Sequence, residues 1–240
     1  MIPLRDENPT EITPFVTGLF IALNLAAWVL LQGAGSPQVL EASVFAFGSV
    51  PCEITGECAV EGLGYSSMLT SIFMHGGWGH LIGNMVFLWV FGNNVEDSMG
   101  HLRFVAFYLL CGLAASLAHI VLAPASQIPM VGASGAISGI MGGYVLLYPR
   151  VRVHTWFPPF FFLDIPAWFF LGYWFVLQLL MGVGTLGPQM AEQGGVAVWA
   201  HVGGFVVGVV LVKIFEKRQL SEAKRHKVKL TRAEAADLEW

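Results

Sequence analysis

Ser134 and His201 are the two residues whose types and positions could support nucleophilic chemistry in this chain. Ser134 lies in VGASGAISG, 131–139, and His201 lies in WAHVGGFVVG, 199–208. A serine hydroxyl becomes a nucleophile when an imidazole within hydrogen-bonding distance removes its proton. No Asp or Glu falls in the middle of the apolar segments. Any such chemistry must therefore use a Ser–His pair without an acid to orient the imidazole.

A second pair of polar residues, His80 and Asn84, lies in HGGWGHLIGN, 75–84. The two residues are four positions apart, so in a helix they share one face. Two side-chain donors on one face can bind the negative oxygen that develops when a carbonyl is attacked. The alternative is that each side chain bonds a neighbouring helix and serves only packing. The spacing leaves both interpretations open.

Six apolar segments must position these residues, and each is long enough to cross a membrane as a helix. The 240-residue chain is 55% hydrophobic and 12% charged, with a mean hydropathy of +0.66, whereas ordinary soluble domains carry about 25% charged residues. A spanning helix needs about 20 apolar residues, and no stretch shows the alternation typical of a barrel strand. The predicted spans are 15–31, 79–95, 102–123, 131–148, 166–186 and 196–215. We therefore expect an all-α polytopic membrane protein, with one six-helix domain over 15–215 in contact with the lipid bilayer.

The Lys and Arg residues predict the orientation of this bundle. With six crossings both termini lie on one side, together with the turns at Arg103 and Arg150, and all 12 basic residues fall on that side. Positive charge stays cytoplasmic. We therefore expect residues 1–14 to be a cytoplasmic N-terminus and residues 216–240 a charged cytoplasmic tail. The net charge of −4 does not indicate binding to nucleic acid.

The N-terminal sequence MIPLRDENPTE carries three acidic residues and lacks the cationic start of a cleavable signal peptide. We therefore expect the first helix to remain in the protein. Because no organelle transit peptide is visible, the preferred location is a bacterial inner membrane, and an unprocessed eukaryotic chain is the alternative.

Cys52 and Cys58 flank EITGE in the first outer loop. An oxidising exterior permits a disulfide between them, and two free thiols or a weak metal site are the alternatives. The chemistry considered for Ser134 and His201 implies no metal and no cofactor.

Small residues predict which helices meet. They form stripes at Gly135, Gly139 and Gly143 in the fourth span and at Gly204 and Gly208 in the sixth. Such patterns permit close approach of two helices. Tight contact between these spans would bring Ser134 and His201 within hydrogen-bonding reach, with Ser134 about one turn into a helix that begins near Val131. The alternative for Ser134 is a small residue that only lets two helices touch.

In their order along the chain, HGGWGHLIGN, GASG and AHVGG resemble the motifs of the rhomboid family of intramembrane serine proteases. The resemblance covers nearly the whole membrane region, 66–215, and FGNNVED after the second span is similar to the family's turn. A lone G-x-S-G would be a weak signal, whereas the combined motifs are specific. The resemblance implies that Glu96 holds a cytoplasmic turn.

The resemblance also implies an activity and a set of site residues. The protein would be an endopeptidase that cleaves transmembrane segments of single-span membrane proteins through an acyl-enzyme. Ser134 would be the nucleophile and His201 the general base, with an oxyanion site formed by His80, Asn84 and backbone N–H groups from Gly132 onward. The alternative is a proteolytically inactive member of the same fold that binds membrane proteins, but such members tend to lose the serine or the histidine. A small channel or carrier is disfavoured, because buried acids and an inverted repeat are absent from the sequence.

One position departs from the family pattern. Four residues after the nucleophile, family members often have an aromatic ring that packs on the catalytic histidine, and this chain has Ser138. We hypothesise that the Ser138 hydroxyl bonds the imidazole or a water. The glycine-rich segment GVGTLGPQMAEQGG, 182–195, is expected to act as a movable cap over the site.

Overall fold

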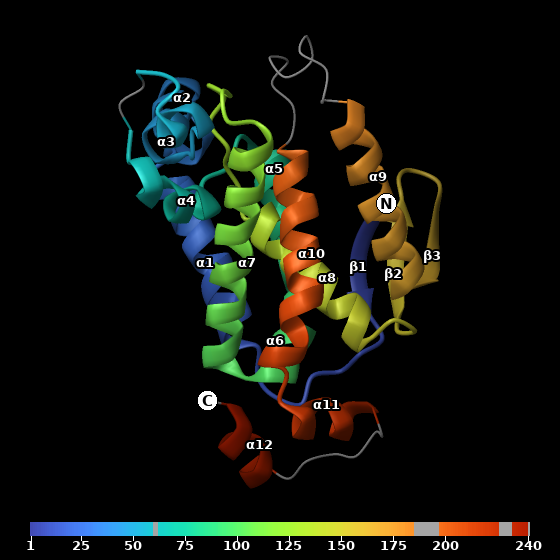
Figure 1. The fold of residues 1–240 in the computed structure, drawn as a ribbon. Coiled ribbons are helices and arrows are strands. Elements are labelled where there is room, and N and C mark those ends of the chain that lie inside the picture. Colours follow the sequence, from blue (N-terminus) through green and yellow to red (C-terminus); the bar gives the residue numbers. More distant parts are fainter. Residues whose placement is uncertain (60–61, 185–196, 226–231, 240) are drawn as a thin grey trace.

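The computed structural model describes residues 1–59, 62–184, 197–225 and 232–239, and Figure 1 shows a bundle of helices with a small sheet along one side. The longer helices are α1 (Phe15–Leu30), α2 (Pro37–Phe47), α5 (Trp78–Phe87), α7 (His101–Leu122), α8 (Ser134–Leu147), α9 (Ala167–Gly184) and α10 (Val198–Phe215). The shorter ones are η1 (Gly33–Gly35), α3 (Pro51–Thr55), η2 (Gly64–Ser66), α4 (Ser67–Thr70), η3 (Ser71–Phe73), the π-helical turn η4 (Leu88–Gly92), α6 (Asn93–Met99), α11 (Arg218–Arg225) and α12 (Arg232–Glu239). Each predicted span contains a helix, although the second continues through η4 and α6 and the fourth begins only at Ser134.

Two of the described helices are long and apolar enough to cross a membrane. α7 and α10 reach mean hydropathies of 2.1 and 2.0. α1, α8 and the part of α9 up to Val183 are apolar but shorter. The six crossings and the cytoplasmic placement of both termini therefore stay predictions.

Glycines let α8 and α10 approach until their backbones touch. A methyl group added at Gly208 would overlap the carbonyl oxygen of Gly139, and one added at Gly204 would overlap that of Gly135. Neither position has room for a side chain, so this approach requires glycine. The close contact predicted from the stripes of small residues is confirmed.

α7 covers another side of α8 with small side chains. A methyl group added at Gly135 would lie 2.6 Å from the Cβ atom of Ala115, and one at Gly139 would lie 2.5 Å from the sulfur of Cys111. Almost every residue of α8 is buried as a result, and Figure 1 shows this helix behind α10. The first residue of α8 is Ser134, and this candidate nucleophile is half-buried.

Glu96 in the middle of α6 holds the start of α1. Its buried carboxylate accepts hydrogen bonds from the N–H groups of Val16 and Thr17 at 2.8 Å and from the Thr17 hydroxyl at 2.7 Å. The residue before α1 is Pro14, which has no side-chain acceptor for these N–H groups. Glu96 therefore takes the place of a helix cap, and it also accepts a hydrogen bond from His101 Nδ1 at 2.6 Å.

Asp97 joins both ends of the chain to α6. One carboxylate oxygen accepts the N–H groups of Glu11 and Ile12 at 2.8 and 2.7 Å. The other accepts a hydrogen bond from Lys224 Nζ at 2.6 Å. Burial lowers the pKa of Lys224, and the charge of Asp97 opposes that shift. The described part of the predicted charged tail is helical from Arg218 onward, and the bond from Lys224 docks α11 on α6.

Three short strands form an antiparallel sheet that the sequence analysis did not predict. They are β1 (Ile2–Asp6), β2 (Arg152–Phe157) and β3 (Phe161–Pro166), in the order β1-β2-β3. Figure 1 shows this sheet beside α9. The expectation of an all-α protein is therefore incomplete. The pairing of β1 with β2 joins segments far apart in the sequence, and a distant partner leaves no local pattern.

The segment between α1 and α5 lies at the opposite end of the bundle from α11 and α12 (Figure 1). Cys52 and Cys58 are joined by a disulfide there, which is one of the alternatives that the sequence left open. The Cys52 N–H donates to the Ser126 carbonyl at 3.0 Å, and Ser49 and Met130 exchange two backbone hydrogen bonds at 2.9 and 2.8 Å. This segment therefore holds the connection between α7 and α8, which leads directly to Ser134.

Gly208→Ala tests the backbone contact between α8 and α10. The added methyl group overlaps the Gly139 carbonyl oxygen, so the two helices must separate. We expect a loss of about 1–3 kcal/mol in the free energy of unfolding, measured by thermal unfolding of the purified protein in detergent micelles.

Gly18→Ala on α1 is the matched control, because nothing lies within 4 Å of the added methyl group. Alanine favours a helix over glycine, so this variant should unfold at the wild-type temperature or above it. Equal losses of unfolding free energy in both variants would contradict a specific role for the α8–α10 contact.

Candidate active site

Ser134 is the first residue of α8, not a residue one turn inside it. The prediction that the helix begins near Val131 is wrong, because Gly132 has a φ of +122°, a value that no residue of a right-handed helix adopts. The chain therefore turns into the helix only at Ser134. As the first residue of a helix, Ser134 has a backbone N–H without a partner within that helix.

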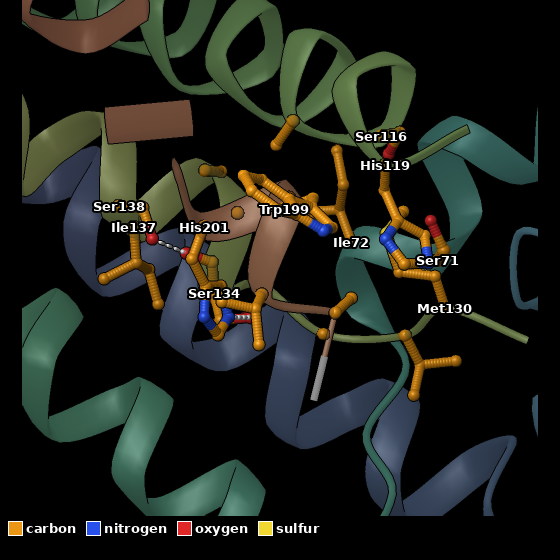
Figure 2. A pocket seen from close by; sticks show the side chains of 18 of the residues that line it. Ser71, Ile72, Ser116, His119, Met130, Ser134, Ile137, Ser138, Trp199 and His201 are labelled. Carbon is orange, nitrogen blue, oxygen red and sulfur yellow. Dashed lines mark hydrogen bonds between the residues drawn. The ribbon is translucent and has the colours of Figure 1, made fainter. Parts of the chain in front are cut away.

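His201 is brought to Ser134 by the contact between α8 and α10. Its Nε2 lies 2.7 Å from Ser134 Oγ (Figure 2), and its side chain is 7% exposed. His201 lies one turn before Gly204, whose backbone packs on Gly135, the residue after Ser134. The predicted proximity of these two side chains is present in the structure.

α9 contributes two contacts to the imidazole of His201 that the sequence analysis missed. Gln178 Oε1 lies 2.9 Å from Nδ1, and the Trp174 ring lies 5.7 Å from the imidazole, centre to centre. Gln178 carried a usable signal, because a polar side chain in an apolar segment needs a partner. Trp174 carried none, because aromatic residues are frequent throughout this segment.

Ser138 does not bond the imidazole. Its hydroxyl donates to the backbone carbonyl of Ser134 at 2.6 Å, which is a common bond for a serine inside a helix. The aromatic ring that rhomboid proteins often carry at this position has a counterpart in Trp174, which packs on His201 from another helix. The hypothesis that Ser138 bonds His201 is therefore wrong in this structure.

His80 and Asn84 present two donors near Ser134, the candidate nucleophile. His80 Nδ1 accepts the N–H of Gly76 at 3.3 Å, so in the neutral ring Nε2 carries the proton and can donate. Asn84 Nδ2 is buried without a hydrogen-bond partner among the described residues. A methyl group added at Gly132 would lie 2.6 Å from His80 Nε2 and 3.5 Å from Asn84 Nδ2. Both donors therefore face one point, two residues before Ser134.

Gly132 contributes space rather than a donor. Its N–H already donates to the Ser71 carbonyl at 2.9 Å, so it is not directed at an oxygen bound beside Ser134. The expectation that this N–H belongs to the oxyanion site is therefore corrected, and the N–H of Ser134 is the backbone donor that the start of α8 offers. Gly132 leaves open the volume that His80 Nε2 faces.

These groups line a cavity of about 920 Å³ enclosed by α5, α7, α8, α9 and α10. Figure 2 shows Ser134 and His201 on one side of the cavity and His119, Ser116 and Ser71 on another. Among the described lining residues the titratable side chains are His80, His119 and His201. Most of the predicted cap, 182–195, lies outside the described residues, which stop at 184 and resume at 197.

This arrangement has the parts needed for acyl transfer. It combines a hydroxyl, a base in hydrogen-bonding contact with that hydroxyl, and donors for a negative oxygen, all within one cavity. The donors are neutral, so they do not require buried counter-charges.

A comparison with protein families matches residues 63–218 to the Rhomboid domain. The matched region includes α5 to α10 and therefore Ser134, His201, His80, Asn84 and Gln178. It covers more than half of the chain.

Curated relatives carry names from the same family. The chain is 37% identical over 154 residues to the rhomboid protease GluP of Bacillus subtilis (strain 168), covering 61% of this chain and 29% of that protein. It is 31% identical over 156 residues to the chloroplastic rhomboid-like protein 11 of Arabidopsis thaliana, covering 62% and 52%. It is 27% identical over 148 residues to the mitochondrial rhomboid protein 1 of Saccharomyces cerevisiae, covering 60% and 40%. The matched part of the chain thus spans between about a third and a half of these relatives' own lengths.

Gly132→Ala tests the space beside the nucleophile. The added methyl group lies 2.6 Å from His80 Nε2, so the imidazole must move away from Gly132. We expect a fluorophosphonate that reacts with activated serines to label this variant about 100-fold more slowly than the wild type.

Gly172→Ala on α9 is the control, because nothing lies within 4 Å of its added methyl group. It should label at the wild-type rate. Thermal unfolding of both variants separates a loss of reactivity from a loss of folding. Wild-type labelling of a folded Gly132→Ala variant would show that His80 does not act beside Ser134.

Proposed function

The chain belongs to the rhomboid family, and we propose that it is an intramembrane serine endopeptidase that cleaves membrane proteins within the bilayer. The observation that carries this proposal is the distance of 2.7 Å between Ser134 Oγ and His201 Nε2 inside a cavity at the centre of the bundle. A serine that serves only packing needs no imidazole at its hydroxyl. An inactive, binding-only relative would have no requirement for this pair.

In the acylation step, Ser134 Oγ attacks the carbonyl carbon of the scissile peptide bond. His201 Nε2 takes the hydroxyl proton as the new C–O bond forms. The carbonyl oxygen becomes negative and accepts hydrogen bonds from His80 Nε2, Asn84 Nδ2 and the N–H of Ser134. The imidazolium then gives its proton to the departing amine, the C–N bond breaks, and an acyl-enzyme remains on Ser134.

Deacylation repeats these steps with water as the nucleophile. His201 Nε2 takes a proton from water as its oxygen attacks the ester carbonyl, and the same three donors hold the oxyanion. The proton passes to Ser134 Oγ as the ester bond breaks, which releases the carboxylic acid product and restores the hydroxyl. The cavity lies among polar side chains that can hold the water this step requires.

The substrate is a transmembrane segment, and its entrance lies between α5 and α9. The contact there is made by aromatic rings: Phe170 of α9 lies 6.1 Å from Phe87 and 6.0 Å from Phe91. Such rings can separate without breaking any hydrogen bond. A bound helix must unwind locally, because its peptide carbonyls are covered by the helical backbone. Helix-breaking or small residues near the cleaved bond should therefore favour cleavage.

The proposal includes the position of the protein in the membrane. The six helices cross the bilayer, both termini are cytoplasmic, and the disulfide of the segment between α1 and α5 lies on the oxidising side. The position of α11 supports this orientation. This basic helix packs on α6 at the end of the bundle opposite to the disulfide. We place the protein in a bacterial inner membrane, with single-span membrane proteins as substrates.

Cleavage of single-span substrates by the purified protein in liposomes is the decisive experiment. We expect cleavage by the wild type and none by Ser134→Ala or His201→Ala, because each substitution removes one half of the dyad. Cleavage that survives Ser134→Ala would refute the mechanism. Binding of the same substrates without cleavage by the wild type would favour the binding-only alternative.

Asn84→Ala should lower kcat by about 100- to 1000-fold with little change in KM. The lost donor acts on the oxyanion, which exists only in the transition state and the intermediate. Asn24→Ala is the matched control: Asn24 is a buried asparagine of α1 whose amide donates to the Phe20 carbonyl of its own helix. This control should keep the wild-type kcat. A rise in KM with an unchanged kcat for Asn84→Ala would assign that residue to substrate binding.

A further inference from the structure

The imidazole of His201 is held at both ring nitrogens. Nε2 lies 2.7 Å from Ser134 Oγ and Nδ1 lies 2.9 Å from Gln178 Oε1. A serine hydrolase often uses a carboxylate at the second nitrogen. No carboxylate lines this cavity among the residues that the structure describes, where the other titratable groups are His80 and His119. The group in contact with Nδ1 is a neutral amide.

The direction of the two hydrogen bonds determines which nitrogen carries the proton. When the Ser134 hydroxyl donates to Nε2, that nitrogen is unprotonated and Nδ1 carries the hydrogen. Nδ1 then requires an acceptor, and the amide oxygen of Gln178 is one. The contact therefore favours the tautomer whose Nε2 can receive the serine proton. The same oxygen faces the ring when it becomes a positively charged imidazolium.

Gln178 belongs to a helix that does not carry either member of the dyad. One turn earlier, Trp174 lies against the imidazole, and Phe175 stacks on Phe205 of α10 with ring centres 4.5 Å apart. The backbones of Ser134 and His201 are fixed by α8 and α10, whereas the orientation of the imidazole is fixed from α9. An outward movement of α9 would remove both the amide and the indole from the ring.

We propose that Gln178 is a positioning residue, which holds His201 in the tautomer and orientation that allow proton transfer from Ser134. It takes the place that a carboxylate occupies in a Ser–His–Asp triad, without placing a charge in the membrane interior. It does not touch the reacting atoms. This inference rests on the proposed proteolytic function.

Kinetics of Gln178→Leu and Gln178→Glu in liposomes test the inference. Leucine is similar in size but accepts no hydrogen bond, so kcat should fall about 10- to 100-fold with little change in KM. Glutamate retains an acceptor and should restore most of kcat. Its carboxylate stabilises the imidazolium, so the acid limb of the pH–rate profile should move to higher pH.

Leu180→Ala is the control on the same helix. Leu180 is 66% exposed, so this variant should keep the wild-type kcat and pH profile. A wild-type kcat in Gln178→Leu overturns the inference. An equal loss of kcat in Gln178→Leu and Gln178→Glu, with an unchanged pH profile, also overturns it, because only the packing of α9 would then matter. Cleavage by Ser134→Ala, measured in parallel, refutes the proposed function itself and is distinct from both outcomes.

Discussion

The site depends on one backbone contact, in which glycines of α10 lie directly on the carbonyl groups of α8. Gly204 packs on Gly135 and Gly208 on Gly139, without space for a methyl group at either α10 position. Lipid tails are as apolar as most side chains, so helices in a bilayer are held by close packing rather than by a hydrophobic force. Glycine gives the closest packing available. The register of this contact also determines the chemistry, because it sets the side chain of His201 beside Ser134.

Charged groups and neutral polar groups occupy different parts of the structure. The buried carboxylates of Glu96 and Asp97 lie at the α6 end of the bundle, where they bond the N–H groups at the start of α1 and the Nζ atom of Lys224. The polar side chains that line the central cavity, among the described residues, carry hydroxyls, amides, imidazoles and indoles. A buried charge without a partner is costly. A dyad that is neutral before reaction, and charged only while substrate supplies the opposite charge, avoids that cost.

The site is divided between a closely packed part and a part held by larger side chains. α8 and α10 fix Ser134 and the backbone of His201 through backbone contact. α9 reaches the same imidazole through Trp174 and Gln178. Beside α9, the sheet formed by β1, β2 and β3 joins the N-terminal segment to the connection between α8 and α9. α9, which lies next to the proposed entrance, thus also contacts the imidazole of His201.

The apolar helices, the stripes of glycine and the main polar residues could be predicted from the sequence, because each follows from residue type and local spacing. Those residues are Ser134, His201, His80 and Asn84. The hydrogen-bond partners of each side chain, in contrast, depend on how the helices pack in three dimensions. The tertiary structure assigned Ser138 to a backbone carbonyl, the Gly132 N–H to Ser71, and Gln178 to the imidazole. It also paired β1 with β2. The Ser138 bond lies within one helical turn, whereas the other contacts join segments that are distant in the sequence. No period or spacing in one sequence identifies the partner in such a distant contact.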